Sequence, residues 1–222
     1  MKRLALISIG FLFFACGGNE ETNNNSEVDE NATDTSSVSE NNLEVEQVAR
    51  EKDYCEYTFL EDLNNEISQT AKVEPIGLFD STWVVGEESV NGFNIKLWRV
   101  ENDYIGFMNQ YQGSPEPYRS GPIVFGRYIE KSELKLVAYL KLSKGFSDWE
   151  SSEPVILTIS SKLTEEALKG TMENKNCVTG ESSEYIPNSI NLLFSDMWGP
   201  LEEYENIQAW KTANEYELNM TK

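Results

Sequence analysis

The chain has 222 residues, 18 Lys and Arg against 38 Asp and Glu, a formal net charge of −20, and no histidine. Without histidine it has no Ser-His-Asp or Cys-His nucleophile, no His-ligated zinc and no imidazole pH switch. The excess of negative charge argues against nucleic acid as a partner, because phosphates attract the opposite sign. The length allows one large domain or two small ones.

The first sixteen residues carry a targeting signal. The basic pair Lys2-Arg3 precedes a twelve-residue apolar run that ends at Ala15. Twelve residues are too few to cross a bilayer, which takes about 20, so residues 1–15 are expected to form a signal peptide. The Ala15-Cys16 pair, followed by two glycines, resembles the lipobox of bacterial lipoproteins, although Phe13 stands where leucine is usual. The alternative is an ordinary signal peptide with an incidental cysteine.

The lipoprotein resemblance implies that Cys16 is acylated and that the membrane is a partner of the chain. Two or three acyl chains such as palmitate anchor stably, since each buried methylene contributes about 0.8 kcal/mol. By the same resemblance, Gly17 in place of aspartate allows delivery to the outer membrane, and Gly17-Gly18-Asn19-Glu20-Glu21 resembles the acidic tag of surface lipoproteins from Bacteroidota-type bacteria. The expected location is the cell envelope. The chain would be lipid-anchored in the outer membrane, on either its periplasmic side or its cell-surface side.

Residues 16–52 are expected to be the lipidated cysteine and a disordered acidic tether. After Cys16 this stretch has no aromatic residue, and its ten carboxylates face only Arg50 and Lys52. Such a segment buries too little apolar surface to offset its conformational entropy. A spacer is one interpretation, and an acidic tail that captures a basic partner is the other. Residues 53–222 are then a single β-rich domain.

The two other cysteines, Cys55 and Cys177, form an even pair in an exported protein. In an oxidising compartment, such a pair predicts a disulfide between the two cysteines. It would close a loop of about 120 residues and stabilise the domain by roughly 4 to 5 kcal/mol in the loop-entropy model. Two buried free thiols are the alternative, whereas a catalytic cysteine lacks a histidine to activate it.

Short alternating segments dominate from Trp83 onward. Asn91-Gly92 predicts a tight turn, and in the strand after it Trp98 shares the polar parity of Asn94 and Lys96. A loop is expected over residues 112–122, and a helix over about 200–216, where apolar residues recur at helical spacing. The predicted strands are Thr82–Gly86, Phe93–Val100, Tyr104–Tyr111, Ile123–Ile129, Leu134–Leu142, Val155–Ser161 and Ala167–Met172.

This order predicts a mainly β domain, an antiparallel meander that closes into a barrel, with a β-sandwich as the alternative and a short C-terminal helix. Trp83 on a first strand, Gly121-Pro122-Ile123 and Gly126-x-Tyr128 resemble lipocalin-like domains over about residues 78–174. Their Gly-x-Trp signature appears here as Ser81-Thr82-Trp83, without its glycine. The resemblance implies a lipocalin-like barrel that binds a small apolar ligand in its mouth and is not an enzyme.

The sequence offers little catalytic chemistry. It has no phosphate-binding loop, dinucleotide fingerprint, nucleophile elbow or Cys-x-x-Cys, so no cofactor is expected, and no metal site is indicated. Asp148, Glu150 and Glu153 lie near Trp149 and would allow a carboxylate-based glycoside hydrolase. In a chain with 38 acidic residues such neighbours are expected by chance, and a solvated loop is the favoured interpretation.

Three aromatic residues are candidate contacts for a ligand or partner: Trp98, and Tyr111 and Tyr118 at the ends of a proline-containing loop. Packing against neighbouring strands or the C-terminal helix is the alternative for each. The leading functional hypothesis is a non-enzymatic, lipid-anchored binding module for a small apolar ligand or a partner protein. The alternative is an acidic surface protein that binds or inhibits a basic partner such as lysozyme.

Overall fold

The computed structural model describes residues 53–56, 58–85, 89–130, 132–143, 146, 153–196 and 199–220. The signal peptide, Cys16 and the acidic tether lie outside the described residues, and so do Asp148, Trp149 and Glu150.

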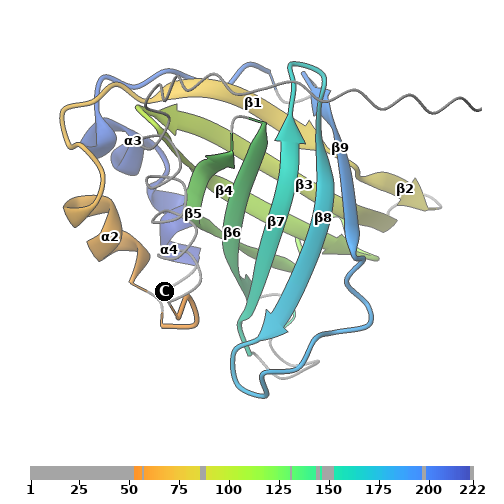
Figure 1. Cartoon of the computed structure of the whole chain (residues 1–222). Coiled ribbons are helices and arrows are strands. Elements are labelled where there is room, and N and C mark those ends of the chain that lie inside the picture. The colour runs from red at the N-terminus through yellow and green to blue at the C-terminus, as the bar shows by residue number, and fades with distance from the viewer. Residues whose placement is uncertain are drawn as a thin grey trace, which may run out of the picture. The chain divides into compact units, whose positions relative to one another are not determined.

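The described part of the chain is a closed antiparallel barrel of eight strands with one extra strand (Figure 1). The sheet order is β1-β9-β8-β7-β6-β5-β4-β3-β2, and pairing of β1 with β3 closes the ring. This confirms the mainly β, lipocalin-like barrel and excludes the sandwich. The elements are α2 (Phe59–Asn65), β1 (Glu74–Asp80), β2 (Trp83–Val85), β3 (Ser89–Val100), β4 (Asp103–Gln112), β5 (Arg119–Glu130), β6 (Glu133–Leu142), β7 (Val155–Leu163), β8 (Ala167–Asn176), β9 (Ser189–Ser195), α3 (Ile207–Ala213) and α4 (Glu215–Met220).

The start of the barrel differs from the prediction. β1 precedes Trp83 and was missed because Pro75 and Gly77 interrupt its pattern, and the register shifts between these two residues. The barrel also continues beyond residue 174, since β9 pairs with both β8 and β1. β2 pairs only with the first residues of β3 and stands outside the closed ring (Figure 1).

The predicted turn at Asn91-Gly92 is wrong, because both residues lie within β3 and pair with β4. Gly92 has a φ of +116°, and a Cβ there would stand 2.6 Å from the Ser81 carbonyl oxygen. The glycine therefore serves the close approach of the segment that joins β1 to β2, not a hairpin.

The loop predicted over residues 112–122 is shorter, because β5 already begins at Arg119. Gly121 and Pro122 misled the prediction, yet both pair with β4. A Cβ on Gly121 would collide with the Tyr139 carbonyl of the neighbouring strand, so the glycine allows β5 and β6 to approach.

The C-terminal helix is also shorter than predicted and is split into α3 and α4. Residues 201–206 are not helical: the backbone of Tyr204 exchanges two hydrogen bonds with Val73, which holds it extended. α3 begins only after this bridge, where the side chain of Asn206 accepts a hydrogen bond from the Ala209 amide and caps the helix.

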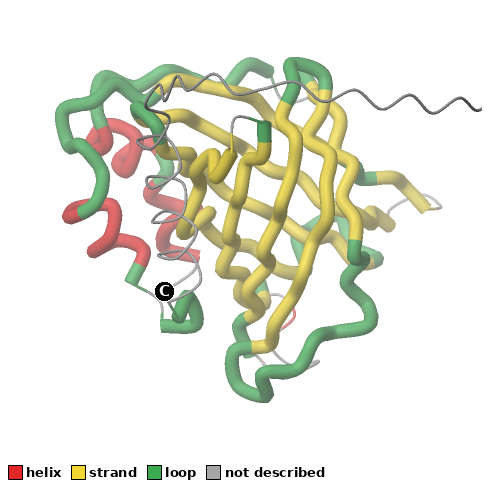
Figure 2. Tube along the Cα trace, in the orientation of Figure 1, coloured by secondary structure: helices red, strands yellow, loops and turns green. Residues whose placement is uncertain are grey.

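The described helices gather on one side of the barrel (Figure 2). α3 packs Ile207 and Trp210 against outward-facing side chains of β3 and β4, and the Trp210 ring stacks on Phe107 at 5.3 Å. Trp98 meets Trp210 edge to face at 5.9 Å, and its indole N–H donates to the Glu202 carbonyl at 2.9 Å. The sheet here is thus apolar on both faces, with the barrel interior behind one and the helices over the other.

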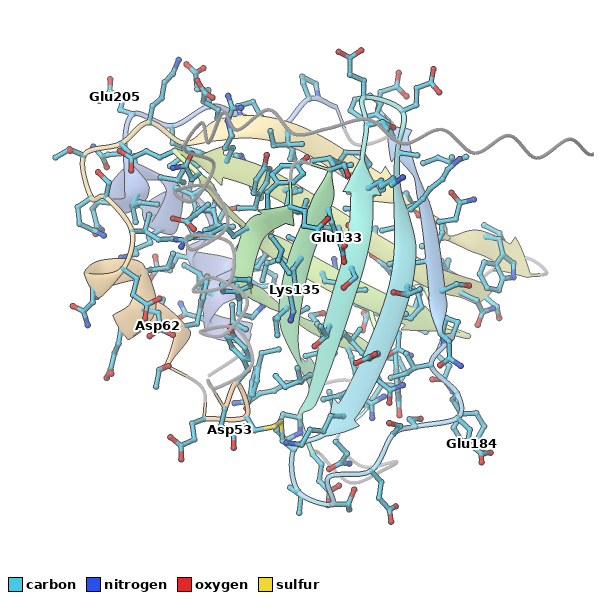
Figure 3. The ribbon with its side chains drawn as sticks, viewed as in Figure 1. Asp53, Asp62, Glu133, Lys135, Glu184 and Glu205 are labelled. Atoms are coloured by element: carbon cyan, nitrogen blue, oxygen red, sulfur yellow. A yellow bond between two sulfur atoms is a disulfide. The ribbon has the colours of Figure 1, made fainter. Side chains whose placement is uncertain are left out.

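A disulfide joins Cys55 to Cys177 across 122 residues, as predicted. Both cysteines pack against Val137, Tyr139 and Ile156 on the outer face of the barrel. The bond therefore fastens the segment before α2 to the end of β8, and Figure 3 shows it beside Asp53.

Candidate functional site

The barrel interior is filled by its own side chains. Alternate residues of the strands point inward, and none of the nineteen buried residues in this cluster is more than 7 % exposed. Eleven of them are 0 % exposed, which leaves no open space beside them. These eleven are Ile95, Leu97, Met108, Leu134, Leu136, Ala138, Leu140, Leu157, Ile159, Leu168 and Leu192. The finding argues against a ligand inside the barrel, which the lipocalin resemblance implies.

The three aromatic residues proposed as contacts do not form one surface. Trp98 is 2 % exposed beneath the helices, and Tyr118 is 7 % exposed and packs edge to face on Phe146. Tyr111 is half-buried and its hydroxyl accepts a hydrogen bond from the Asn94 amide. Packing, the alternative interpretation, is therefore what the structure shows for Trp98 and Tyr118.

Trp98 and Tyr111 are also far apart. Their partners in the β3–β4 ladder are Ile105 and Gly92, so six residue pairs separate them. At about 3.3 Å per residue this is roughly 20 Å.

Of the three carboxylates suggested for hydrolysis, only Glu153 is a described residue. It accepts a hydrogen bond of 2.7 Å from the side-chain amide of Asn176. Among the residues that the structure describes, no group of three or more acidic or cysteine side chains is placed to hold a metal ion.

A groove between α2 and the outer face of β4 and β5 is the candidate site with the most apolar side chains in its lining. It encloses a volume of about 100 Å³. Phe59, Leu63 and Ile67 line it from the side of α2, and Ile105, Val124 and Phe125 from the barrel. Tyr54 is a further lining residue. The side chains of Phe59 and Leu63 are only 2 % and 1 % exposed. The helix therefore holds an apolar wall of the groove in place.

The floor of this groove is a β-bulge. Asp103 pairs with Arg127 but Gly106 pairs with Ile123, so β5 carries one more residue than β4 between these pairs. The register of β5 with β6 shifts at Val124 as well. A bulge bends its strand and interrupts the ladder, and such irregularities are common next to binding sites.

Charged groups surround the apolar floor. Arg127 donates to Asp103 at 2.7 Å, and this pair borders the bulge on one side. Asp62 and Glu66 add two further carboxylates from the side of α2, and Figure 3 shows Asp62 on that helix. Burial raises the pKa of the Tyr54 hydroxyl, and the charges of Glu66 and Asp62 raise it further. The tyrosine is therefore neutral, in a negative local potential.

Sequence reasoning missed this groove although a signal was present. Phe59, Leu63 and Ile67 recur every four residues, which is the spacing of one helix face. The β-bulge that forms the floor of the groove has no recognisable signal in the sequence of β5.

No family model matches the chain, and neither a curated protein nor a solved structure matches it. Within the described residues, no helix is long and apolar enough to span a bilayer.

Proposed function

We propose that this protein is a lipid-anchored, non-enzymatic binding protein of the bacterial outer membrane. The lipobox-like sequence at Cys16 and the acidic segment after it support the anchor and the tether. The domain would take a small apolar group, of a free ligand or of a partner protein, in the groove between α2 and the β4–β5 bulge.

The groove carries this proposal because it brings apolar and aromatic side chains together with polar groups in one concave site, a combination that ligand sites use. The barrel interior is filled by its own side chains, so the groove is the better candidate for a ligand site. A ligand in the groove would contact α2, whose position depends on the disulfide at Cys55 four residues before it.

Calorimetric titration of the full-length protein with 3,3-dimethyl-1-butanol, a compact neutral alcohol, tests the groove. Ile67→Trp adds bulk to the groove wall and should abolish binding, whereas Leu193→Trp, at a 55 % exposed position of β9, should leave it unchanged. Equal affinities for the two variants would refute the groove as the site. Mass spectrometry of the N-terminal peptide tests the anchor, and an unmodified Cys16 in protein from its own membrane would refute it.

Binding of a basic partner protein is the second candidate, favoured by the charge of the domain. Residues 53–222 carry 28 acidic and 14 basic residues, and Figure 3 shows carboxylates spread over the surface. Such binding should weaken steeply with salt, because exposed charges are screened beyond about 8 Å at physiological ionic strength. Salt-independent or absent binding to lysozyme and other basic envelope proteins would count against it.

A further inference from the structure

We propose that a polar cavity between the end of β8 and the loop that joins it to β9 is a further binding site, which takes a neutral carbohydrate of about two sugar rings. The site is separate from the groove at α2, because the two linings share no residue. The inference therefore stands whether or not the groove binds a ligand.

The lining of this cavity is mostly polar. Its residues are Glu173 and Asn174 of β8 and, from the loop, Ser182, Ser183, Glu184, Ile186, Pro187 and Asn188. Such a lining favours a ligand with a polar surface, since polar groups that an apolar ligand covered would lose their water without a new partner. It contains two carboxylates and no basic residue, so it repels an anion.

The walls of the cavity are held in place by the fold. The side-chain amide of Asn174 accepts a hydrogen bond from the Ser183 amide at 2.6 Å and donates one to the Ser183 carbonyl at 3.3 Å. The Ser182 hydroxyl donates to the Asn174 carbonyl at 2.8 Å. Ile186 is 3 % exposed and belongs to the cluster that fills the barrel. The loop is therefore fixed to β8 before a ligand arrives, which lowers the cost of binding.

Three side chains of the lining are available to a ligand. Within the part of the chain that the structure describes, the carboxylates of Glu173 and Glu184 and the amide of Asn188 have no hydrogen bond or ion pair. Carboxylates accept hydrogen bonds, and an amide both accepts and donates them. Sugar hydroxyls do both as well, and their bonds to an ionised acceptor are the stronger kind.

Tyr185 places an aromatic side chain between two lining residues, Glu184 and Ile186. It is 87 % exposed, and Figure 3 labels its neighbour Glu184 on the loop. A pyranose ring carries C–H groups on its faces, and these pack against aromatic rings while the hydroxyls at its edge form hydrogen bonds. An aromatic ring in water beside free polar groups is therefore a combination that suits a sugar.

The volume of the cavity, about 560 Å³, sets the size of the ligand. It lies within the range of about 300 to 1,000 Å³ that ligand pockets span. A cavity of about 150 Å³ holds the six heavy atoms of benzene, so this one takes roughly 22 heavy atoms. That is the size of a disaccharide.

NMR titration of the full-length protein with cellobiose and with maltose tests the site. The resonances of the Ile186 methyl groups and of the Asn188 side-chain amide should shift saturably with at least one of these neutral sugars. Cellobiouronic acid, which has a carboxylate in place of one hydroxymethyl group of cellobiose, should bind at least about 3-fold more weakly than the better neutral sugar. No shift with either neutral sugar, or equal or tighter binding of the acid, would overturn the inference.

Two variants with matched controls locate the binding. Tyr185→Ala should weaken it about 2- to 10-fold, whereas Tyr216→Ala, at a 73 % exposed position of α4, should leave it unchanged. Glu173→Gln should weaken it about 3- to 10-fold by removing a charged acceptor, whereas Glu205→Gln, at an exposed position before α3 (Figure 3), should not. Effects of the test variants no larger than those of their controls would overturn the cavity as the site.

Discussion

Truncation of Leu157 tests whether the barrel interior is packed or hollow. Leu157 is 0 % exposed in the interior of the barrel, on β7 between Ala138 of β6 and Asn174 of β8. Leu157→Ala removes buried methyl groups and leaves a cavity between paired strands that cannot close around it. The cost for such sites is about 3 to 5 kcal/mol. That is a large part of the roughly 5 to 15 kcal/mol by which a domain is stable.

Urea denaturation of the wild type and Leu157→Ala measures this loss, and the slope with denaturant should be the same for both. Lys162→Ala, on the same strand but exposed, is the matched control and should change stability by less than about 0.5 kcal/mol. A loss for Leu157→Ala no greater than that for the control would mean that Leu157 faces open space. The barrel interior would then be hollow enough to hold a ligand, contrary to what is inferred here from its burial.

Three more predictions concern the disulfide, a helix cap and a tyrosine. Reduction of the Cys55–Cys177 bond, which spans 122 residues, should lower the free energy of unfolding by up to about 5 kcal/mol, and an unchanged urea midpoint would contradict this. Asn206→Ala removes the acceptor for the Ala209 amide and should cost about 1 kcal/mol, with a null result in thermal unfolding counting against the cap. Burial, and then Tyr128, raise the pKa of Tyr104 from 10.0 to about 12, so the unfolded chain releases this proton first and stability should fall between these pH values. Tyr104→Phe should reduce that fall, and an unchanged pH dependence of stability would refute the shift.

The strands with strict alternation were predictable from the sequence. In β6, Leu134, Leu136 and Ala138 occupy every second position and all three point into the barrel. Burial on one face fixes the register of such a strand, so its pattern survives in the sequence.

Close approaches between strands were not predictable. Gly92 and Gly121 signal turns in a sequence, yet here each lies within a strand where a neighbouring backbone leaves no room for a side chain. Local turn chemistry and tertiary packing select the same residue, and only the fold distinguishes them. The candidate site was missed for a similar reason, since it depends on how α2 meets a bulge at Val124 far along the chain.

Methyl NMR of the full-length protein during titration with 3,3-dimethyl-1-butanol tests the central claim most directly, because the groove and the barrel interior both carry methyl groups. Leu63 and Ile105 line the groove, whereas Leu136 and Leu157 are packed in the interior. The account predicts saturable shifts of the Leu63 and Ile105 methyl resonances and none for the two interior leucines. Shifts at Leu136 and Leu157 with none at Leu63 and Ile105 would contradict it.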